Sequence, residues 1–289
     1  MLFQRIKKKI RIPLSNKKWE CTEVHFQRVF DLLEDLDWLL PRESQVHELF
    51  YGLLQNEEER DLITILLKKV IFLSDDASRS KISDIATHIT DTWKCTAKDT
   101  IVIGAKDNND ADGSDVFVYG LRNALRWPDK RIQTNYSAIE EPAMMSEIKN
   151  IVIADDFTGS GKRMDGILKK VTAKVGSDIT VRFVSIGIMP DVVKENYPAV
   201  LSFEYYAPVK VYSGFDHTQE TSKTSLMTQI ESYLSPKYNR LKLSDFHLGF
   251  KESGALYWNK QYRVPNNVYP VFWWGYKKDK TPYNAIMKD

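Results

Sequence analysis

The chain has 289 residues, of which 43% are hydrophobic and 12% aromatic, enough for one large domain or a domain with a sizeable extension. Its net charge of +2 excludes a general polyanion binder, and no run of about 18 apolar residues could cross a membrane. The two cysteines, Cys21 and Cys95, lie far apart without a CxxC or a nearby histidine pair, which indicates a reduced, cytoplasmic protein.

The chain begins with a basic arm. Seven cations precede the first acid, Glu20: Arg5, Lys7, Lys8, Lys9, Arg11, Lys17 and Lys18. Such an arm can touch phosphates or anionic lipid, and a solvated terminus has the same composition. No apolar core of about seven residues follows the charges, so the arm is not expected to be a signal peptide.

A helical region is predicted next. Residues 24–40 place apolar side chains at helical spacing, and Pro41 is expected to end that helix. A second, short helix is predicted over residues 44–55. The three histidines of this region are expected to be ordinary helix residues rather than ligands: His25, His47 and His88.

Two further helices are predicted before residue 95. Asn56 is expected to cap the third, with Glu59 completing a capping box ahead of the apolar run 62–73. The fourth is predicted from Ser80 onward. Its apolar face holds Ile82, Ile85 and Ile89.

From Thr100 the pattern changes to alternating strands and helices. Strand-like runs cover residues 100–104, 150–156, 178–189 and 200–213, and helix-like runs cover residues 114–127 and 162–175. This alternation predicts βαβ units and a mainly parallel sheet. The aromatic-rich tail, residues 246–276, is expected to form hairpins and loops.

The stretch IVIADDFTGSGKRM carries the most chemistry. Six residues follow its buried strand and open a helix: Thr158, Gly159, Ser160, Gly161, Lys162 and Arg163. Ligands of an open α/β sheet bind beyond the carboxyl ends of its strands. Glycines let backbone N–H groups approach an anion, and a helix N-terminus adds partial positive charge, so a phosphate is expected here.

Two acids stand immediately before this turn. Asp155 and Asp156 suit hydroxyl groups, as acceptors for a ribose diol. A phosphate on one side and a diol on the other describe a ribose 5-phosphate. The alternative is a tight strand-to-helix turn that the acids merely cap.

Two other phosphate motifs fail on this stretch. A nucleoside-triphosphate P-loop needs Gly where Asp156 stands and Ser or Thr where Arg163 stands. The dinucleotide fingerprint GxGxxG is absent.

The stretch resembles the signature of phosphoribosyltransferases. In that resemblance residues 151–154 are the hydrophobics, Asp155 and Asp156 the ribose-binding acids, and residues 159–163 the 5-phosphate loop. It departs at the end of the loop, where Lys162 and Arg163 replace the usual Gly and Thr.

A narrower resemblance covers residues 99–276. DDFTGSGKR, HLGF and YRVPNNVYPVFWW are similar to phosphoribosyltransferase-like proteins of bacterial conflict and antiphage defence loci, including retron systems. It implies a phosphoribosyltransferase-type α/β fold with a mainly parallel sheet. The implied division is a basic arm and helical region (1–95), an α/β core (96–240) and a C-terminal hood (241–289).

The resemblance also implies a pyrophosphate loop, at residues 104–115. Lys106 is its cation and Asp107 its neighbour, and the acidic loop calls for Mg²⁺ as a cofactor to mediate pyrophosphate binding. A calcium loop and a plain solvated loop remain open as alternatives, although Tyr119 stands where a calcium loop needs Glu. Arg122 could reach a phosphate or pair with an acid.

The tail offers weaker candidates. Asn266 and Asn267 form a turn after Pro265 and, by the resemblance, contact the base or ribose. The aromatic run Phe272, Trp273 and Trp274 is expected to be core rather than a stacking platform. Asp216 and His217 are adjacent, so they are not expected to form an acid–base pair.

The resemblance implies an enzyme that binds a ribose-5-phosphate-bearing substrate, phosphoribosyl pyrophosphate or a nucleotide, and transfers or cleaves at its anomeric carbon. It would act as an effector in antiphage defence. The alternative is a non-catalytic nucleotide-sensing or partner-binding module, with a protein or RNA partner on the helical region and basic arm. No general base is evident from the sequence.

Overall fold

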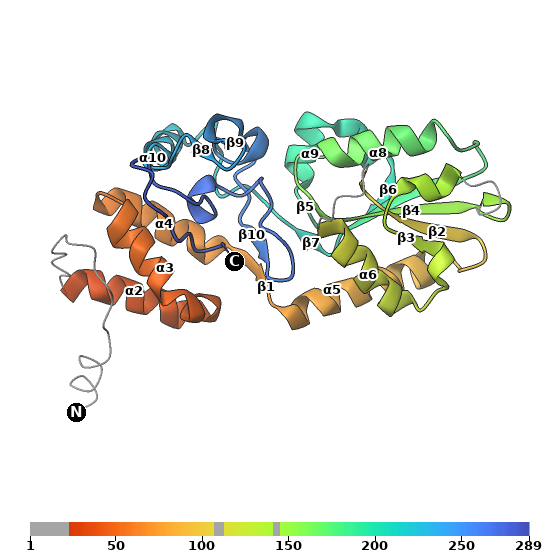
Figure 1. The fold of residues 1–289 in the computed structure, drawn as a ribbon, viewed down its shortest axis with the longest axis horizontal. Helices are drawn as coiled ribbons and strands as arrows, with labels where there is room; N and C mark the ends of the chain where they lie inside the picture. Colours follow the sequence, from red (N-terminus) through yellow and green to blue (C-terminus); the bar gives the residue numbers. More distant parts are fainter. Residues whose placement is uncertain (1–22, 107–112, 141–144, 289) are drawn as a thin grey trace, which may run out of the picture.

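Two lobes lie side by side in the computed structural model, which describes residues 23–106, 113–140 and 145–288 (Figure 1). A sheet lobe contains the parallel strands, and a helical lobe combines residues 23–73 with residues 213–288. The chain therefore begins and ends in the same lobe. The basic arm lies outside the described residues.

The central sheet has the strand order β3-β2-β4-β5-β6, with β7 also paired to β5. Every pairing in it is parallel, which confirms the expected parallel sheet. The strands are β2 (Thr100–Gly104), β3 (Ile132–Gln133), β4 (Asn150–Thr158), β5 (Thr180–Ile188), β6 (Glu204–Tyr206) and β7 (Val209–Lys210). The fold is of the α/β class.

Helices cover both faces of this sheet. Helices α5 (Asp75–Thr87) and α6 (Gly113–Leu125) lie on one face, and α8 (Lys162–Thr172) and α9 (Pro190–Asn196) on the other (Figure 1). Alternate residues of β4 pack into two different hydrophobic clusters, one on each face of the sheet. Val152 packs in the cluster with α5 and α6, whereas Ile151 and Ile153 pack with α8. Nearly continuous apolar strands are typical of a sheet buried on both faces.

The helical lobe contains α2 (Glu23–Asp35), α3 (Glu43–His47), α4 (Glu57–Lys69) and α10 (Thr221–Glu231), with the short hairpin β8 (Lys237–Tyr238) and β9 (Leu241–Lys242). The predicted helix over 24–40 ends earlier, at Asp35, and Pro41 lies inside the 3₁₀ segment Asp37–Arg42. Proline clashes with the residue four positions earlier in an α-helix, so an α-helix cannot continue through Pro41.

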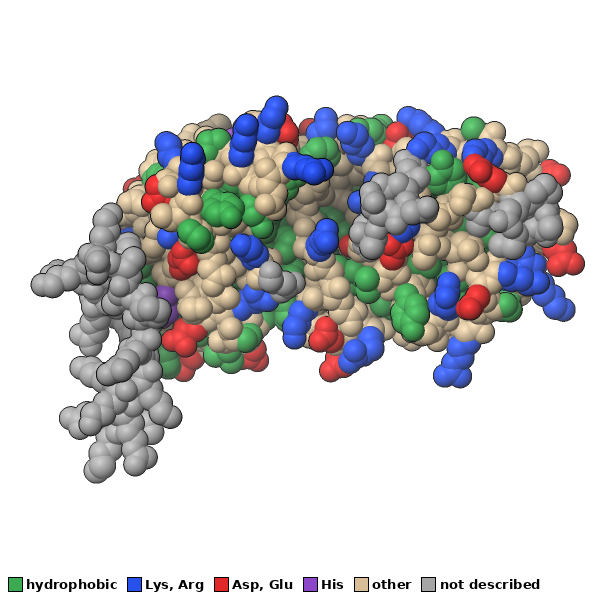
Figure 2. All heavy atoms as spheres, viewed as in Figure 1, with side chains coloured by type: hydrophobic (Ala, Val, Ile, Leu, Met, Phe, Trp, Pro, Cys, Tyr) green, Lys and Arg blue, Asp and Glu red, His purple; other side chains and the backbone are tan. Residues whose placement is uncertain are grey.

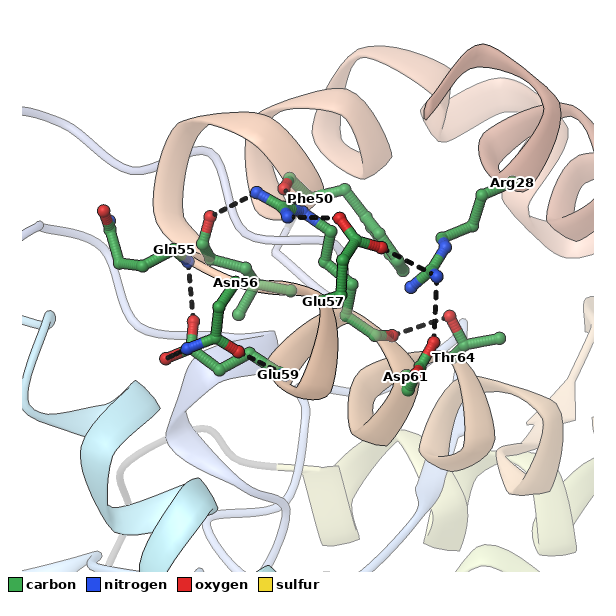
Figure 3. A network of polar contacts seen from close by, with 10 residues as sticks. Arg28, Phe50, Gln55, Asn56, Glu57, Glu59, Asp61 and Thr64 are labelled. Carbon is green, nitrogen blue, oxygen red and sulfur yellow. Dashed lines mark hydrogen bonds and ion pairs between the residues drawn. The ribbon is translucent and has the colours of Figure 1, made fainter. Parts of the chain in front are cut away.

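The predicted cap of α4 is confirmed. Asn56 accepts a hydrogen bond from the Glu59 backbone N–H at 2.9 Å, and the Glu59 carboxylate accepts one from the backbone of Gln55 at 2.6 Å (Figure 3). Glu59 is fully buried and also accepts 2.8 Å hydrogen bonds from Gln229 and Tyr233. The same carboxylate therefore ties α4 to the α10 segment.

Two expectations for residues 62–87 are wrong. The helix stops at Lys69, and Ile71–Leu73 form β1, which pairs in parallel with β10 (Tyr257–Asn259) from the tail. Helix α5 begins after Ser74 rather than at Ser80, because the Ser74 hydroxyl accepts the Ala77 N–H at 3.3 Å. Ile82, Ile85 and Ile89 are buried as expected.

Across residues 23–106, 113–140 and 145–288, no helix combines the length and apolar character that crossing a bilayer requires.

Candidate functional site

A cavity of about 800 Å³ opens at the carboxyl end of β4, between the sheet lobe and the tail. The candidate residues from separate parts of the sequence meet here. Those that line it are Lys106, Asp155, Asp156, Thr158, Gly159, Ser160, Gly161, Lys162, Arg163, Asn266 and Asn267. Asp107 lies outside the described residues.

The predicted phosphate turn joins β4 to α8 as expected. Gly161 is the N-cap residue of α8 and has φ = +86°, in the left-handed region that glycine tolerates. The Lys162 backbone N–H approaches the Ser160 hydroxyl at 3.4 Å. The first N–H groups of α8 and its positive dipole end therefore face this part of the cavity, which is the arrangement that binds a phosphate.

The two acids leave β4 in opposite directions, because successive strand residues point to opposite faces. Asp155 is 2% exposed, and Arg163 of α8 donates to it at 3.4 Å. Asp156 faces the start of α6, where a Cβ on Gly113 would lie 2.5 Å from its Oδ2. The two carboxylates thus reach the cavity from either side of the strand rather than as a side-by-side pair.

Two buried tyrosines lie on the Asp156 side. Burial raises the pKa of the Tyr257 and Tyr262 hydroxyls, and the Asp156 charge raises both further. These hydroxyls stay protonated at neutral pH. Tyr257 also stacks on Phe157, with ring centroids 4.7 Å apart, which holds the strand end against β10.

Lys106 has an acid partner inside the protein. Its ammonium lies 2.5 Å from the Asp115 carboxylate, and its side chain is 7% exposed. A cation that is buried on a carboxylate is less available to a free pyrophosphate. The structure therefore brings Lys106 to the cavity with much of its charge neutralised.

The predicted turn at 265–267 is present and lines the cavity. Val268 donates to the Pro265 carbonyl at 3.0 Å, closing the turn. The Asn267 amide nitrogen donates to Ser253 at 2.9 Å. Its amide oxygen stands so near Gly159 that a Cβ there would lie 2.0 Å away. The tail is thus in direct contact with the phosphate turn.

The segment that supports Asn267 has an unusual backbone. Five of its residues have positive φ: Leu248, Gly249, Lys251, Glu252 and Gly254. Non-glycine residues rarely adopt this region, and such conformations persist only where the surroundings impose them. Here the buried Glu231 accepts the Leu248 N–H at 3.2 Å and pairs with His247 at 2.6 Å. The hydrogen bond that His247 donates to Glu231 raises the pKa of His247, and burial raises that of Glu231.

Phe250 and Arg263 are among the lining residues that were not predicted from the sequence. Arg263 is exposed and makes no ion pair with another described residue. Lys162 also lines the cavity and likewise makes no ion pair with another described residue. Its ammonium lies 5.8 Å from the centre of the Phe250 ring. A cation two residues before Pro265, in the quoted stretch YRVPNN, was the available signal for Arg263.

Other candidates lie away from the cavity. Arg122 donates to the Ile132 carbonyl at 3.0 Å and lies 3.6 Å from Asp129, so it pairs with an acid. Phe272 and Trp274 are fully buried core residues, as expected. His217 bonds Tyr269 at 2.8 Å rather than its neighbour.

Mg²⁺ prefers one or two protein carboxylates together with substrate phosphates and water. Within the described parts of the chain, no group of three or more His, Cys, Asp or Glu residues could hold a metal ion by itself. Asp155 and Asp156 line a cavity with an expected phosphate position, so the donor set fits an ion that arrives with a phosphorylated substrate.

The PRTase-CE family profile matches residues 54–288. Among solved structures, the chain is similar to a hypothetical protein from Neisseria gonorrhoeae with bound ppGpp, at 12% identity and a TM-score of 0.36, over 49% of this chain and 84% of that one. It is also similar to a hypoxanthine-guanine phosphoribosyltransferase from Bacillus anthracis, at 14% identity and a TM-score of 0.32, over 53% and 92% of the two chains. A third is the HGPRT-ase from Leishmania tarentolae in complex with GMP, at 14% identity and a TM-score of 0.32, over 52% and 89%.

Proposed function

The chain belongs to the PRTase-CE family, and we propose that it binds a substrate bearing a ribose 5-phosphate and transfers or cleaves at its anomeric carbon. Phosphoribosyl pyrophosphate and nucleotides are the substrate class. One observation carries the proposal: the turn 158–163, both acids of β4 and the turn 265–267 line a single cavity of about 800 Å³. Cavities of about 300–1,000 Å³ are typical of small-molecule sites.

The 5-phosphate anchors the substrate in this proposal. The turn around Gly161 and the N-terminus of α8 hold it through backbone N–H groups, with Lys162 and Arg163 adding charge. Asp155 and Asp156 accept hydrogen bonds from the ribose hydroxyls, one from each side of the strand. Fixing the sugar at both ends orients its anomeric carbon, and positioning of this kind contributes several kcal/mol.

The reaction breaks the bond between the anomeric carbon and its leaving group while a nucleophile approaches the opposite face. Positive charge develops on the ring in an oxocarbenium-like state, and nearby carboxylates stabilise it. Asp155 is placed for this role because it lines the cavity at the carboxyl end of β4. Mg²⁺, when bound with the substrate, neutralises a pyrophosphate leaving group.

A second candidate is a module that binds the same ligand without turnover. It is favoured by the lining itself: among the described residues around the cavity none is a histidine or cysteine, and Lys106 is paired with Asp115. A role in antiphage defence, with a partner protein or RNA, completes the proposal and rests on the sequence resemblance alone. A cytoplasmic location is proposed from the two widely separated cysteines.

Thermal unfolding with a ligand panel tests the site. The panel is phosphoribosyl pyrophosphate, nucleoside mono- and triphosphates and NAD, each with and without Mg²⁺. A ligand at a hundredfold excess over its Kd stabilises the fold by about 2.7 kcal/mol. We expect a magnesium-dependent shift with one phosphoribosyl ligand that Asp156→Asn loses and the control Asp178→Asn, on an exposed turn, retains.

Release of the leaving group from the ligand so identified then separates the two candidates. Turnover that Asp156→Asn abolishes supports the transferase, and binding without turnover supports the sensing module. If no ligand of the panel shifts the unfolding of the wild type, the proposed site is wrong for both.

A further inference from the structure

A basic surface lies in the helical lobe, outside the cavity. It consists of the β8–β9 hairpin, residues 237–242, and the segment 276–280 near the C-terminus. We propose that this basic surface binds single-stranded nucleic acid, independently of the reaction proposed for the cavity.

The fold brings these two segments side by side. Leu234, just before the hairpin, forms an antiparallel bridge with Lys277, and Ser235 donates to the Tyr276 carbonyl at 2.9 Å. The Tyr238 ring packs against Tyr276, with centroids 5.9 Å apart. The hairpin and the segment 276–280 therefore form one continuous face.

Most cations of this face are not neutralised by another residue of the described structure. Five are exposed and form no ion pair with another described residue: Lys237, Arg240, Lys242, Lys278 and Lys280. Lys277, within the segment 276–280, is paired with Glu48. Elsewhere in the helical lobe Lys68 is paired with Asp35, Lys223 with Glu220 and Lys260 with Asp75. Figure 2 shows Lys and Arg side chains gathered along this edge of the molecule, over α10, β8 and β9.

Few acids oppose this charge. Asp245 and Asp279 are the described carboxylates within or next to the two segments in sequence, and Asp279 is engaged by the N–H of Thr281 at 2.9 Å. In space, Glu48 adds a third, which pairs with Lys277. A chain with a net charge of only +2 thus concentrates positive charge on one small face. Such a local excess attracts a polyanion even where the whole molecule does not.

The face also carries aromatic rings, and these favour single-stranded nucleic acid over other polyanions. Tyr276 is 38% exposed, and Tyr238, half-buried beneath it, packs on Trp274 with centroids 5.6 Å apart. A ring held in place between cations offers a platform on which an unpaired base stacks while its phosphates meet Lys and Arg. A bilayer would need several apolar anchors; Leu241, 37% exposed, is the exposed large aliphatic side chain of the two segments.

Fluorescence anisotropy of labelled single-stranded DNA and RNA oligonucleotides with the full chain tests the proposal. The variant is Lys237→Gln/Arg240→Gln/Lys242→Gln. The control, Lys98→Gln/Lys130→Gln/Lys194→Gln, removes equal charge from exposed positions of the sheet lobe. Each lost phosphate contact lowers the magnitude of the slope of log K against log salt concentration by about 0.7. The slope should therefore be smaller by roughly 2 for the triple hairpin variant and unchanged for the control.

A second pair tests stacking. Tyr276→Ala should weaken binding by about fivefold or more, and Tyr276→Phe should retain it, because the ring remains. This readout does not depend on charge.

The proposal is overturned if the wild-type chain binds no oligonucleotide, or if the hairpin variant binds as tightly as its control, which would place any binding elsewhere. It is also overturned if the wild-type chain binds phosphatidylserine vesicles but no oligonucleotide, and the hairpin variant no longer binds the vesicles. That result would make the face a membrane contact.

Discussion

At the scale of single residues, Gly159 is a point of close approach between the sheet lobe and the tail at the cavity. A Cβ at this position would lie 2.0 Å from the Asn267 amide oxygen and 2.2 Å from its Cγ. Asn267 cannot retreat easily, because its amide nitrogen is bonded to Ser253 and the residue is 6% exposed. The lack of a side chain at Gly159 is therefore what lets the tail close over the phosphate turn.

Gly159→Ala should accordingly displace the 265–267 turn and weaken binding of the phosphoribosyl ligand at least tenfold, about 1.4 kcal/mol. Isothermal titration of the variant measures this. The control is Gly176→Ala, an exposed position outside the cavity where a Cβ meets nothing within 4 Å. That change should leave the ligand affinity unchanged. Unchanged ligand affinity in Gly159→Ala would mean that the contact with Asn267 has no part in the site.

At the residue level, one short stretch was enough to group candidate site residues, and their roles in binding stay predictions. The turn 158–163 and the acids before it follow from local patterns, and all of them line the cavity. The partner of Lys106 could not be predicted, since Asp115 is one of four acids in the loop that follows it. Phe250 was also missed, because the backbone next to it has an unusual conformation that is held by a carboxylate 17 positions before Leu248, Glu231.

At the scale of elements, the pairing of β1 with β10 joins the two ends of the helical lobe. Trp258 of β10 lies at its centre: its ring is 5.3 Å from that of Phe72 in β1, 5.9 Å from that of Trp38, and 4.1 Å from the Arg42 guanidinium. The side chain is 1% exposed. These contacts link β1, β10 and the 3₁₀ segment Asp37–Arg42.

Trp258→Ala should therefore lower the free energy of unfolding by about 3–5 kcal/mol. Trp258→Phe should cost less, because it keeps an aromatic ring and removes an indole N–H that has no hydrogen-bond partner in the described structure. Urea denaturation with a common m-value measures both. A loss below about 1 kcal/mol in the alanine variant would show that the aromatic cluster does not hold the two strands together.

Element prediction failed where a partner from far along the chain decided the outcome. Residues 62–73 read as one apolar helix, yet Ile71–Leu73 form a strand because β10 supplies hydrogen bonds nearly two hundred positions later. In contrast, the cap at Asn56 was predictable because both of its partners are local. The strands β2, β4 and β5 were predictable because they are largely buried and nearly continuously apolar. The two-residue strand β3 was not predicted, and the run expected over 200–213 forms a 3₁₀ segment and the short strands β6 and β7.

At the scale of the whole molecule, the cavity is built by both lobes. The phosphate turn and the acids belong to the sheet lobe, and Phe250, Arg263 and the 265–267 turn belong to the tail. One apolar cluster nevertheless runs through both, from Leu32 in α2 to Val152 in β4. A ligand bound in the cavity should therefore restrain two segments that are distant in sequence, residues 158–163 of the sheet lobe and residues 248–254 of the tail.

Hydrogen exchange with and without the phosphoribosyl ligand tests this coupling. Amides of residues 158–163 and of residues 248–254 should both exchange more slowly in the complex, because the ligand contacts the first and holds the second through Asn267. Amides of the β8–β9 hairpin, which lies outside the cavity, serve as the internal reference and should be unchanged. Slower exchange in the phosphate turn alone would mean that the tail is a scaffold beside the site rather than one of its walls.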